Sequence, residues 1–438
     1  MLKFATMQKT VALHTLGCKL NYSETTTLGR MLEQDGFAQK KFDEVADVYV
    51  INTCSVTENA DKECRQIVRK IQRNAPEALV VITGCYAQLK PEAIATIPGV
   101  DLVLGAAEKF NITTHLRELS KNDATKICSC DIADVNQFVP TYSLHERTRV
   151  FLKVQDGCNY NCSFCTIPLA RGKSRSDTIA QIVQNVKNIA LAGAKEIVLT
   201  GINLGDFGKA ITLPQTQINS TPNTILPSEN FFSLIQQLDA LAAVPRYRIS
   251  SIEPNLLSND IISFVANSKS FMPHFHIPLQ SGSNRTLAAM RRRYKKELYA
   301  EKVALIKKLM PHCCIGVDVI VGFPGETEAD FMETVMFLRA LPISYLHVFT
   351  YSERDNTHAL TINPVVPVHI RHARNKILRT VSFQKMQAFT AAHIGQIRPV
   401  LFESVNKNGI IEGYTDNYIK ITAAYKSEWE NEIVPWQV

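Results

Sequence analysis

Short apolar runs alternate with amphipathic stretches along the first part of the chain. Two helical patterns, Ser23 to Gly36 and Thr57 to Asn74, separate runs with the length and composition of buried strands. These strand-like runs are Val11 to Gly17, Asp47 to Asn52, Leu79 to Gly84 and Asp101 to Gly105. Because strand–helix alternation implies a parallel sheet covered by helices, residues 1–120 are predicted to form a doubly wound α/β domain.

A second alternating series follows a polar, poorly patterned segment, residues 121–146, which is expected to be a linker. Its strand-like runs are Arg149 to Gln155, Glu196 to Gly201, Tyr247 to Pro254, His274 to Leu279, Gly316 to Gly322 and Tyr345 to Thr350. Such a series is typical of an incomplete parallel α/β barrel, so residues 147–370 are predicted to form a partial (β/α)6 barrel. The Pro-, Ser-, Thr-, Asn- and Gln-rich segment Leu213 to Glu229 interrupts the series and is expected to be a surface loop.

The pattern changes again at Arg371. A basic helical stretch leads into short β-like runs, such as Val-Leu-Phe-Glu-Ser-Val and Gly-Ile-Ile-Glu-Gly-Tyr. Residues 371–438 are therefore expected to form a third domain, a small β-barrel.

Composition narrows the class of protein. The chain has 438 residues, of which 45% are hydrophobic and 20% charged, the balance of a soluble globular protein. It has no run of about 18 apolar residues, which excludes a transmembrane helix, and its polar first residues lack the apolar core of a signal peptide. We therefore expect a cytoplasmic protein without a membrane partner. Eleven cysteines favour metal binding or catalysis over disulfides in that location. The net charge of +7 permits a polyanionic partner without requiring one.

Three cysteines lie close together in a loop that follows the first strand of the predicted barrel. These cluster-loop cysteines, Cys158, Cys162 and Cys165, have the spacing Cys-x3-Cys-x2-Cys. Three thiolates can hold a cubane cluster and leave one iron without a protein ligand. That iron can chelate the amino and carboxylate groups of S-adenosylmethionine and pass an electron to its sulfonium. The alternatives are a zinc site or core cysteines, but zinc favours four ligands and no fourth cysteine is near in sequence.

Three further cysteines each follow a predicted strand of the first domain. These strand-end cysteines are Cys18, Cys54 and Cys85. The carboxyl ends of parallel strands share one edge of a sheet, where ligands usually bind. Small residues filling strand ends would account for one such cysteine, but for three only by coincidence. A second iron–sulfur cluster with an open iron is the better interpretation.

The cluster-loop sequence Gly-Cys-Asn-Tyr-Asn-Cys-Ser-Phe-Cys resembles the radical S-adenosylmethionine superfamily, over a region from about Arg149 to Leu360. TLGCKLNYSETTTLGRML, VINTCSVTENADKECRQIVRK and VVITGCYAQ look like the N-terminal domain of the methylthiotransferases. With LTGINLG, IPLQSGSN and DVIVGFPGET they extend the resemblance over nearly the whole chain. The last segment resembles the small RNA-binding β-barrel, the TRAM domain, that ends these enzymes. TLGCKLNYSE is most similar to the branch that acts on N6-threonylcarbamoyladenosine at position 37 of tRNA.

This resemblance implies a tRNA methylthiotransferase that modifies C2 of that nucleoside. It also implies two 4Fe–4S clusters and two molecules of S-adenosylmethionine per turnover, one to methylate a sulfur at the N-terminal cluster and one to yield a 5′-deoxyadenosyl radical. The implied partners are the tRNA anticodon stem-loop and an electron donor such as flavodoxin or ferredoxin. The alternatives are methylthiolation of a ribosomal-protein aspartate or of isopentenyladenosine in tRNA, and, more distantly, a non-catalytic iron–sulfur carrier or scaffold.

Residues at the ends of barrel strands are the candidates for binding S-adenosylmethionine. They are Gly201, Ser251, Glu253, Gln280, Val317 and Asp318. Each has an ordinary structural interpretation as well: Glu253 as a capping or solvated carboxylate, Gln280 as a turn residue and Asp318 as an ion-pair partner.

Basic residues are the candidates for binding RNA, although a solvated helix face is the more usual explanation for any single arginine. They are Arg171, Lys173, Arg175, Arg291, Arg292, Arg371, Arg374 and Arg379. The family pattern Arg-x-Gly-Thr-x-Ala is altered between Tyr351 and Ala359, where Asp355 and Asn356 stand in the middle. Asn tolerates the left-handed backbone nearly as well as Gly, so the turn is expected to survive. The remaining five cysteines are interpreted as structural; they are Cys64, Cys128, Cys130, Cys313 and Cys314.

Overall fold

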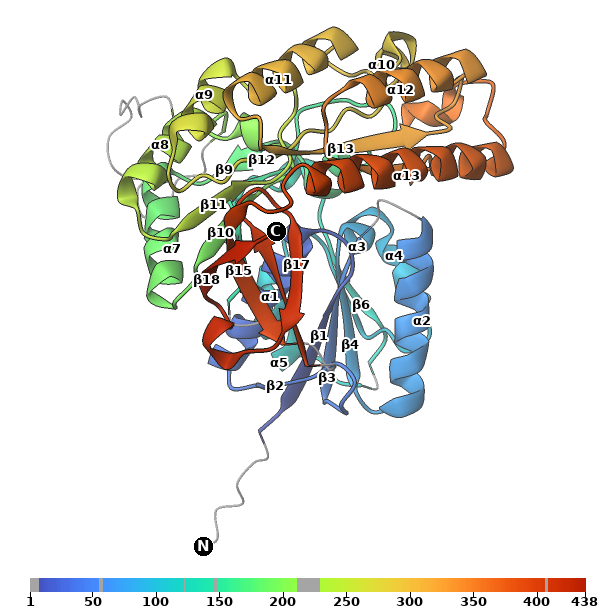
Figure 1. Ribbon diagram of the computed structural model, residues 1–438. Coiled ribbons are helices and arrows are strands. Elements are labelled where there is room, and N and C mark those ends of the chain that lie inside the picture. Colours follow the sequence, from blue (N-terminus) through green and yellow to red (C-terminus); the bar gives the residue numbers. More distant parts are fainter. Residues whose placement is uncertain (1–7, 55–57, 122, 145–147, 211–228, 406–408) are drawn as a thin grey trace, which may run out of the picture. The chain divides into compact units, whose positions relative to one another are not determined.

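A computed structural model describes residues 8–54, 58–121, 123–144, 148–210, 229–405 and 409–438 (Figure 1). The chain divides into two compact units. The first comprises Met1–Ser143 together with Gly157–Asn159 and Thr166–Lys173, and the second comprises the rest. No helix in the described ranges is long and apolar enough to cross a membrane.

A six-stranded, fully parallel sheet in the order β2-β1-β3-β4-β5-β6 forms the centre of the first unit. Its strands are β1 (Thr10–Thr15), β2 (Ala38–Lys40), β3 (Val48–Thr53), β4 (Leu79–Gly84), β5 (Leu102–Leu104) and β6 (Lys126–Cys128). The helices are α1 (Lys19–Gln34), α2 (Glu58–Asn74), α3 (Cys85–Leu89), α4 (Pro91–Ala95) and α5 (Ile112–Arg117), and α6 (Ile167–Arg171) also belongs to this unit.

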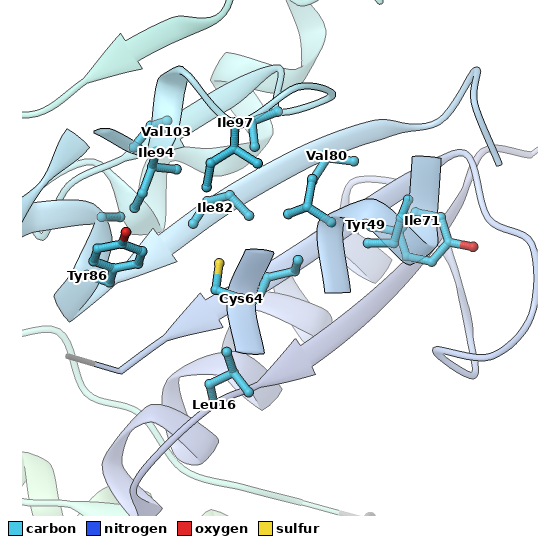
Figure 2. Packing of buried hydrophobic residues seen from close by; sticks show 14 of the residues in the cluster. Leu16, Tyr49, Cys64, Ile71, Val80, Ile82, Tyr86, Ile94, Ile97 and Val103 are labelled. Carbon is cyan, nitrogen blue, oxygen red and sulfur yellow. The ribbon is translucent and has the colours of Figure 1, made fainter. Parts of the chain in front are cut away.

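Both faces of this sheet are covered, as the doubly wound prediction requires. Alternate residues of β3 enter two different apolar clusters: Tyr49 and Ile51 pack with α2 and α4, whereas Val48 and Val50 pack with α1 and α5. Figure 2 shows the first cluster, in which Cys64 of α2 is fully buried. Successive side chains of a strand point to opposite faces, so a strand apolar at every position is buried on both sides.

Helix α1 begins at Lys19 rather than at the predicted Ser23. After Leu20, its first turns bury mainly polar side chains, and buried apolar residues recur only from Leu28 onward. An apolar pattern therefore places the start of this helix too late. The buried polar residues are Asn21, Ser23, Glu24, Thr25 and Thr26.

Six parallel strands form the larger part of the second unit: β7 (Arg149–Lys153), β10 (Glu196–Thr200), β11 (Arg246–Ile249), β12 (His274–His276), β13 (Cys314–Val321) and β14 (Tyr345–Thr350). They make two three-stranded sheets, β11-β10-β7 and β12-β13-β14. A parallel bridge between Ser251 and His276 connects β11 to β12. The spatial order thus follows the sequence order, as expected for an incomplete barrel. Two-residue strands β8 (Gln155–Asp156) and β9 (Arg175–Ser176) pair beside it.

Helices connect the barrel strands, and one long helix covers the outer edge. The connecting helices are α7 (Ile179–Leu191), α8 (Phe231–Leu241), α9 (Asn259–Asn267), α10 (Asn284–Ala289), α11 (Lys296–Leu309) and α12 (Glu328–Ala340). The long helix α13 (Val368–Ala391) lies along the edge strand β14. Asn375 Nδ2 donates to the carbonyl of Val348 (3.1 Å), and Ser382 Oγ accepts from the amide of Leu346 (2.8 Å). These bonds satisfy edge groups that would otherwise remain unpaired.

The C-terminal segment forms a four-stranded antiparallel sheet in the order β17-β16-β15-β18. Its strands are β15 (Ile397–Val405), β16 (Ile410–Thr415), β17 (Lys420–Ala424) and β18 (Ile433–Gln437). Two buried arginines of β11 connect it to the barrel. Arg246 donates to the carbonyls of Pro399 and Tyr414 (2.7 and 3.2 Å). Arg248 donates to the carbonyl of Thr415 and to the carboxylate of Glu196, both at 2.8 Å.

We expect Arg248→Met to destabilise the second unit by about 3–5 kcal/mol, because the buried carboxylate of Glu196 loses a cation and backbone carbonyls of the C-terminal sheet lose a donor. Urea unfolding followed by the fluorescence of Trp429 and Trp436, the only two tryptophans of the chain, measures this effect inside that sheet.

Lys420→Met is the matched control, since Lys420 forms an exposed ion pair with Glu412 and its loss should cost at most about 1 kcal/mol. Equal unfolding midpoints for the two variants would contradict the role given to Arg248.

Candidate metal centres

The three strand-end cysteines lie at the carboxyl edge of the first sheet, as predicted. Cys54 directly follows β3, Cys85 directly follows β4, and Cys18 lies between β1 and α1. Strands β1, β3 and β4 are neighbours in the sheet. All three loops therefore leave the sheet at the same edge, and parallel strand order brings distant cysteines together.

Two glycines at positive φ let the cysteine loops approach one another. Gly17 has φ +102°, and a Cβ at this position would lie 2.8 Å from the Sγ of Cys54. Gly84 has φ +97°, and its Cβ would lie 2.3 Å from the carbonyl oxygen of Thr53. A side chain at either position would clash and strain the backbone. Gly17 directly precedes Cys18, and Gly84 directly precedes Cys85. The loops therefore approach each other at the position where the cysteines would hold a metal.

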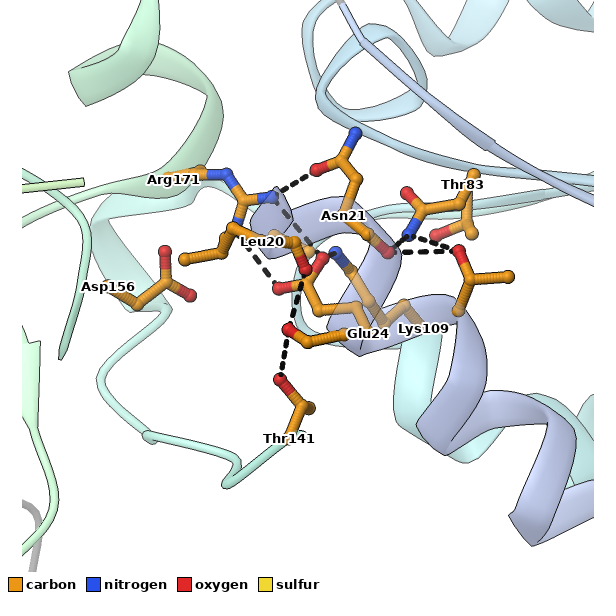
Figure 3. Close-up of polar contacts among 12 residues, drawn as sticks. Leu20, Asn21, Glu24, Thr83, Lys109, Thr141, Asp156 and Arg171 are labelled. Carbon is orange, nitrogen blue, oxygen red and sulfur yellow. Dashed lines mark hydrogen bonds and ion pairs between the residues drawn. The ribbon is translucent and has the colours of Figure 1, made fainter. Parts of the chain in front are cut away.

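A buried polar layer supports this edge (Figure 3). Asn21 Nδ2 donates to the carbonyls of Leu16 and Thr53 (2.9 and 3.0 Å), close in sequence to Cys18 and Cys54. The Asn21 side-chain oxygen accepts from Arg171 (2.6 Å). Asn21 thus connects the ends of β1 and β3.

Glu24 holds the cations of this layer. It binds Arg171 at 3.0 Å and Lys109 at 2.7 Å, and all three side chains are at least 95% buried. Burial raises the pKa of the Cys85 thiol, whereas Arg171 and Lys109 act to lower it. The two cations thus favour the thiolate form that a metal requires. Arg171, predicted to contact RNA, is instead an internal ion-pair partner, and sequence analysis missed Asn21, Glu24 and Lys109.

The cluster-loop cysteines lie between β8 and α6, and backbone contacts hold their loop. The amide of Cys158 donates to the carbonyl of Gly172 (3.0 Å), and the amide of Cys165 donates to the carbonyl of Cys162 (3.2 Å). Ser163 donates through its amide to Met290 (3.1 Å) and through Oγ to Ala289 (2.8 Å).

A guanidinium lies against one of these thiols. Arg292 Nη1 is 3.1 Å from the Sγ of Cys162, and the same side chain forms an ion pair with Glu253. Burial raises the pKa of Cys162, and Arg292 opposes that effect. The side chain of Arg292 is 4% exposed and contacts the thiol of Cys162 and a carboxylate in place of the predicted RNA phosphate.

The donor set fits an iron–sulfur cluster at each position. All eleven cysteines are free thiols. Each set offers three of them from tightly held loops, and neither set has the paired knuckles typical of structural zinc.

Of the residues predicted to bind S-adenosylmethionine at strand ends, Gly201, Ser251, Glu253 and Gln280 follow the ends of β10, β11 and β12, whereas Val317 and Asp318 lie within β13. Gly201 directly follows β10, and Ser251 and Gln280 form bridges to His276 and Val319. Gln280 has φ +69°. Val317 and Asp318 are adjacent on β13 and so point to opposite faces; Val317 is fully buried, and Asp318 binds His276 at 2.8 Å. Cofactor contacts of these residues, and of Glu253, stay predictions.

Sequence analysis also missed Gln155. Its side-chain oxygen accepts from the amides of Ile202 and Asn203 (2.9 and 2.8 Å) and thereby shapes the loop after β10. No pattern in the sequence distinguishes this glutamine from a surface residue.

Three more of the predicted RNA-binding arginines are buried in ion pairs. Arg175 binds Asp156 at 3.1 Å, Arg371 binds Glu353, and Arg374 binds Glu326 at 2.7 Å. This is a correction: carboxylates of the chain itself occupy these guanidinium groups. Among the residues predicted to bind RNA, the exposed ones are Lys173, Arg291 and Arg379.

The altered loop between Tyr351 and Ala359 keeps its turn. Asn356 has φ +62°, the left-handed backbone that the sequence predicted for it. The amide of Ala359 donates to the carbonyl of Ser163 (2.7 Å), so this loop supports the cluster loop. Of the predicted surface loop Leu213 to Glu229, residues 213–228 lie outside the described ranges.

Cysteines outside the two sets differ in exposure. Cys64, Cys313 and Cys314 are fully buried, Cys128 is half-buried and Cys130 is exposed. Burial raises the pKa of Cys314 to about 12.

Comparisons with known proteins agree with this arrangement. Residues 10–105 match the uncharacterized protein family UPF0004, and residues 152–338 match the radical SAM superfamily. The chain is 36% identical over 419 residues to the threonylcarbamoyladenosine tRNA methylthiotransferase MtaB of Bacillus subtilis, covering 94% of this chain and 90% of that protein. The protein of that name in Aquifex aeolicus is 39% identical over 415 residues, with 94% and 96% covered. A tRNA-2-methylthio-N(6)-dimethylallyladenosine synthase of Clostridium botulinum is 30% identical, with 90% and 86% covered.

A solved structure shares the fold at low sequence identity. The radical S-adenosylmethionine methyltransferase TsrM of Kitasatospora setae, with cobalamin and a [4Fe-4S] cluster bound, has a TM-score of 0.54 at 16% identity and covers 78% of this chain and 75% of its own. This likeness supports the α/β architecture of parallel sheets. Two matched domains and relatives more than 30% identical over nearly the full length lead to one conclusion. The chain belongs to the radical S-adenosylmethionine methylthiotransferase family.

Proposed function

We propose that the protein adds a methylthio group to C2 of N6-threonylcarbamoyladenosine at position 37 of tRNA. The observation that carries this proposal is the pair of three-cysteine sets, one at the ends of parallel strands and one in the loop between β8 and α6, in a chain similar over 94% of its length to relatives named for this nucleoside. Cys158, Cys162 and Cys165 would hold one 4Fe–4S cluster. Cys18, Cys54 and Cys85 would hold the second.

When bound, the clusters and S-adenosylmethionine supply the electron, the sulfur, the methyl group and a carbon-centred radical. The chain itself holds and shields them. Arg292 places a positive charge beside Cys162, and Glu24 keeps Arg171 and Lys109 next to the strand-end edge. Gly201, Ser251, Glu253, Gln280, Val317 and Asp318 remain the proposed contacts for S-adenosylmethionine.

The proposed partner is the tRNA anticodon stem-loop. The TRAM-like RNA-binding domain of this proposal is the four-stranded antiparallel sheet at the C-terminus, and Lys173, Arg291 and Arg379 are exposed cations. A flavodoxin or ferredoxin as electron donor and a cytoplasmic location complete the proposal.

The direct experiment is mass spectrometry of nucleosides from tRNA incubated anaerobically with reconstituted protein, S-adenosylmethionine and reductant. We expect 2-methylthio-N6-threonylcarbamoyladenosine. A methylthio product of isopentenyladenosine, or of a ribosomal-protein aspartate in a parallel assay, would replace the proposed substrate. Formation of 5′-deoxyadenosine without any methylthio product on these substrates would refute it.

Single cysteine variants should separate the two proposed clusters. Cys162→Ala should abolish formation of 5′-deoxyadenosine, because the cluster that binds S-adenosylmethionine loses a ligand. Cys54→Ala should retain 5′-deoxyadenosine and lose only the methylthio product. Each should lose about four of eight iron atoms, which iron analysis measures.

Cys130→Ser is the control, because Cys130 is exposed and belongs to neither set. Loss of 5′-deoxyadenosine in both alanine variants but not in the control would mean that the sites do not act separately.

The charge layer under the strand-end cysteines should be needed for stability. Glu24→Gln removes a carboxylate that is 1% exposed and leaves Arg171 and Lys109 without their anion. We expect a loss of about 3–5 kcal/mol in the first unit and a lower iron content. Far-UV circular dichroism during thermal unfolding measures the first effect.

Glu108→Gln is the matched control, since Glu108 is 35% exposed in its pair with His115. A Glu24 variant as stable as this control would show that the layer contributes little.

A further inference from the structure

Three polar side chains meet on one face of the barrel sheet, outside both cysteine sets. His276 of β12, Asp318 of β13 and His347 of β14 come from three adjacent strands. Asp318 pairs with His347 in the strand register, and His276 pairs with Gly316, two residues before Asp318. The three side chains therefore share a face, and their ligand atoms all lie within 4.8 Å of one another.

Aromatic contacts hold this cluster in place. The rings of His276 and His347 stack with centroids 5.3 Å apart, and Tyr345 contacts His347 edge-on at 5.2 Å. The carboxylate of Asp318 is 2.8 Å from Nε2 of His276. His276 and Asp318 are largely buried, whereas His347 is exposed. His347 is thus fixed by its neighbours and accessible to solvent, which suits it to bind a ligand.

His347 also lines a groove of about 620 Å³ between β14 and α13. Two exposed aromatic side chains line it, Phe349 of β14 (45% exposed) and Phe383 of α13 (62% exposed). Arg379 of α13 lines the same groove and has no hydrogen-bond or ion-pair partner within the described ranges. The groove thus combines flat apolar surfaces with two cationic or hydrogen-bond-donating side chains.

The charges decide which kind of ligand fits. Two histidines and a carboxylate around an open position would also suit a divalent metal. However, Asp318 is already bound to His276, and the guanidinium of Arg379 in the same groove would repel a cation. An anion beside an aromatic group is favoured instead, because guanidinium and imidazole bind carboxylates while exposed rings stack on bases.

We propose that this groove recognises the acyl substituent on N6 of the target adenosine, with His347 and Arg379 binding its carboxylate and hydroxyl groups. This inference rests on the proposed function and names His347 and Arg379 as residues that determine specificity within it. The ring of His276 stacks on that of His347, and Asp318 in turn binds His276. A base without the acyl group would offer neither side chain an acceptor.

Binding to two synthetic anticodon stem-loops, with and without threonylcarbamoyl on the adenosine at position 37, tests the proposal without depending on turnover. The wild-type holoenzyme should bind the modified stem-loop about 10 to 100 times more tightly, the range expected for hydrogen bonds to a charged group. His347→Phe, which keeps an aromatic ring, and Arg379→Gln should remove most of this preference. His347→Gln should restore part of it.

Two controls match these changes. His372→Phe alters another exposed histidine, on α13 but outside the groove, and Arg339→Gln alters an exposed arginine of α12. Both should bind like the wild type. Far-UV circular dichroism and the iron content of each variant, compared with the wild type, verify that it is folded and holds its clusters.

The outcomes separate the two proposals. No preference in the wild type, or equal preference in His347→Phe and His372→Phe, would overturn the recognition site. A non-iron metal bound one per chain and lost in His347→Phe would also overturn it, in favour of a metal site. Preference lost as expected, but no methylthio product from the modified tRNA, would support the recognition site and refute the proposed reaction.

Discussion

Parallel strands end at a common edge, and the metal centre proposed for the strand-end cysteines depends on this constraint. In the first unit it gathers Cys18, Cys54 and Cys85, which are separated by more than thirty residues from one to the next. Gathering strand ends is not sufficient by itself, because the loops must also approach closely. Gly17 and Gly84 permit that approach, and Asn21 fastens two of the strand ends to each other. The sheet topology therefore brings the three cysteines close together, and a few local contacts set the positions of their loops.

The fold must also offset the desolvation free energy of its buried charged side chains. Arg248, Arg292 and Arg374 each lie buried against a carboxylate, and the desolvation of such pairs makes them weak stabilisers compared with apolar packing. Their positions explain why they are present. Arg292 lies against a cysteine, and Arg248 joins two sheets through backbone carbonyls. These ion pairs fix particular contacts between elements, which apolar side chains of similar size would leave unspecified.

The features that could be predicted from the sequence are those that depend on residues close together in the chain. Strand and helix order, both cysteine sets and the left-handed turn at Asn356 follow from apolar runs, spacing and the backbone preference of one residue type. The start of α1 was missed because Glu24 and its neighbours are polar yet buried. Buried arginines looked like RNA contacts because exposure is decided by tertiary packing. His276 and His347 went unnoticed because only strand register brings them together.

In the proposed enzyme, one set of residues supports the chemistry and another set recognises the nucleoside. Cysteines, with the charges beside them, can provide chemistry that does not depend on which base is presented. Recognition of a particular nucleoside must come from side chains that touch the group which distinguishes it, since specificity is a difference between two binding energies. Polar donors achieve this discrimination well, because a ligand without the matching group leaves them desolvated and unpaired. A groove at the edge of the barrel that is lined by exposed aromatic rings, His347 and Arg379 has the composition that such discrimination requires. Changes there can alter the substrate while the cysteine-bearing strand ends stay the same.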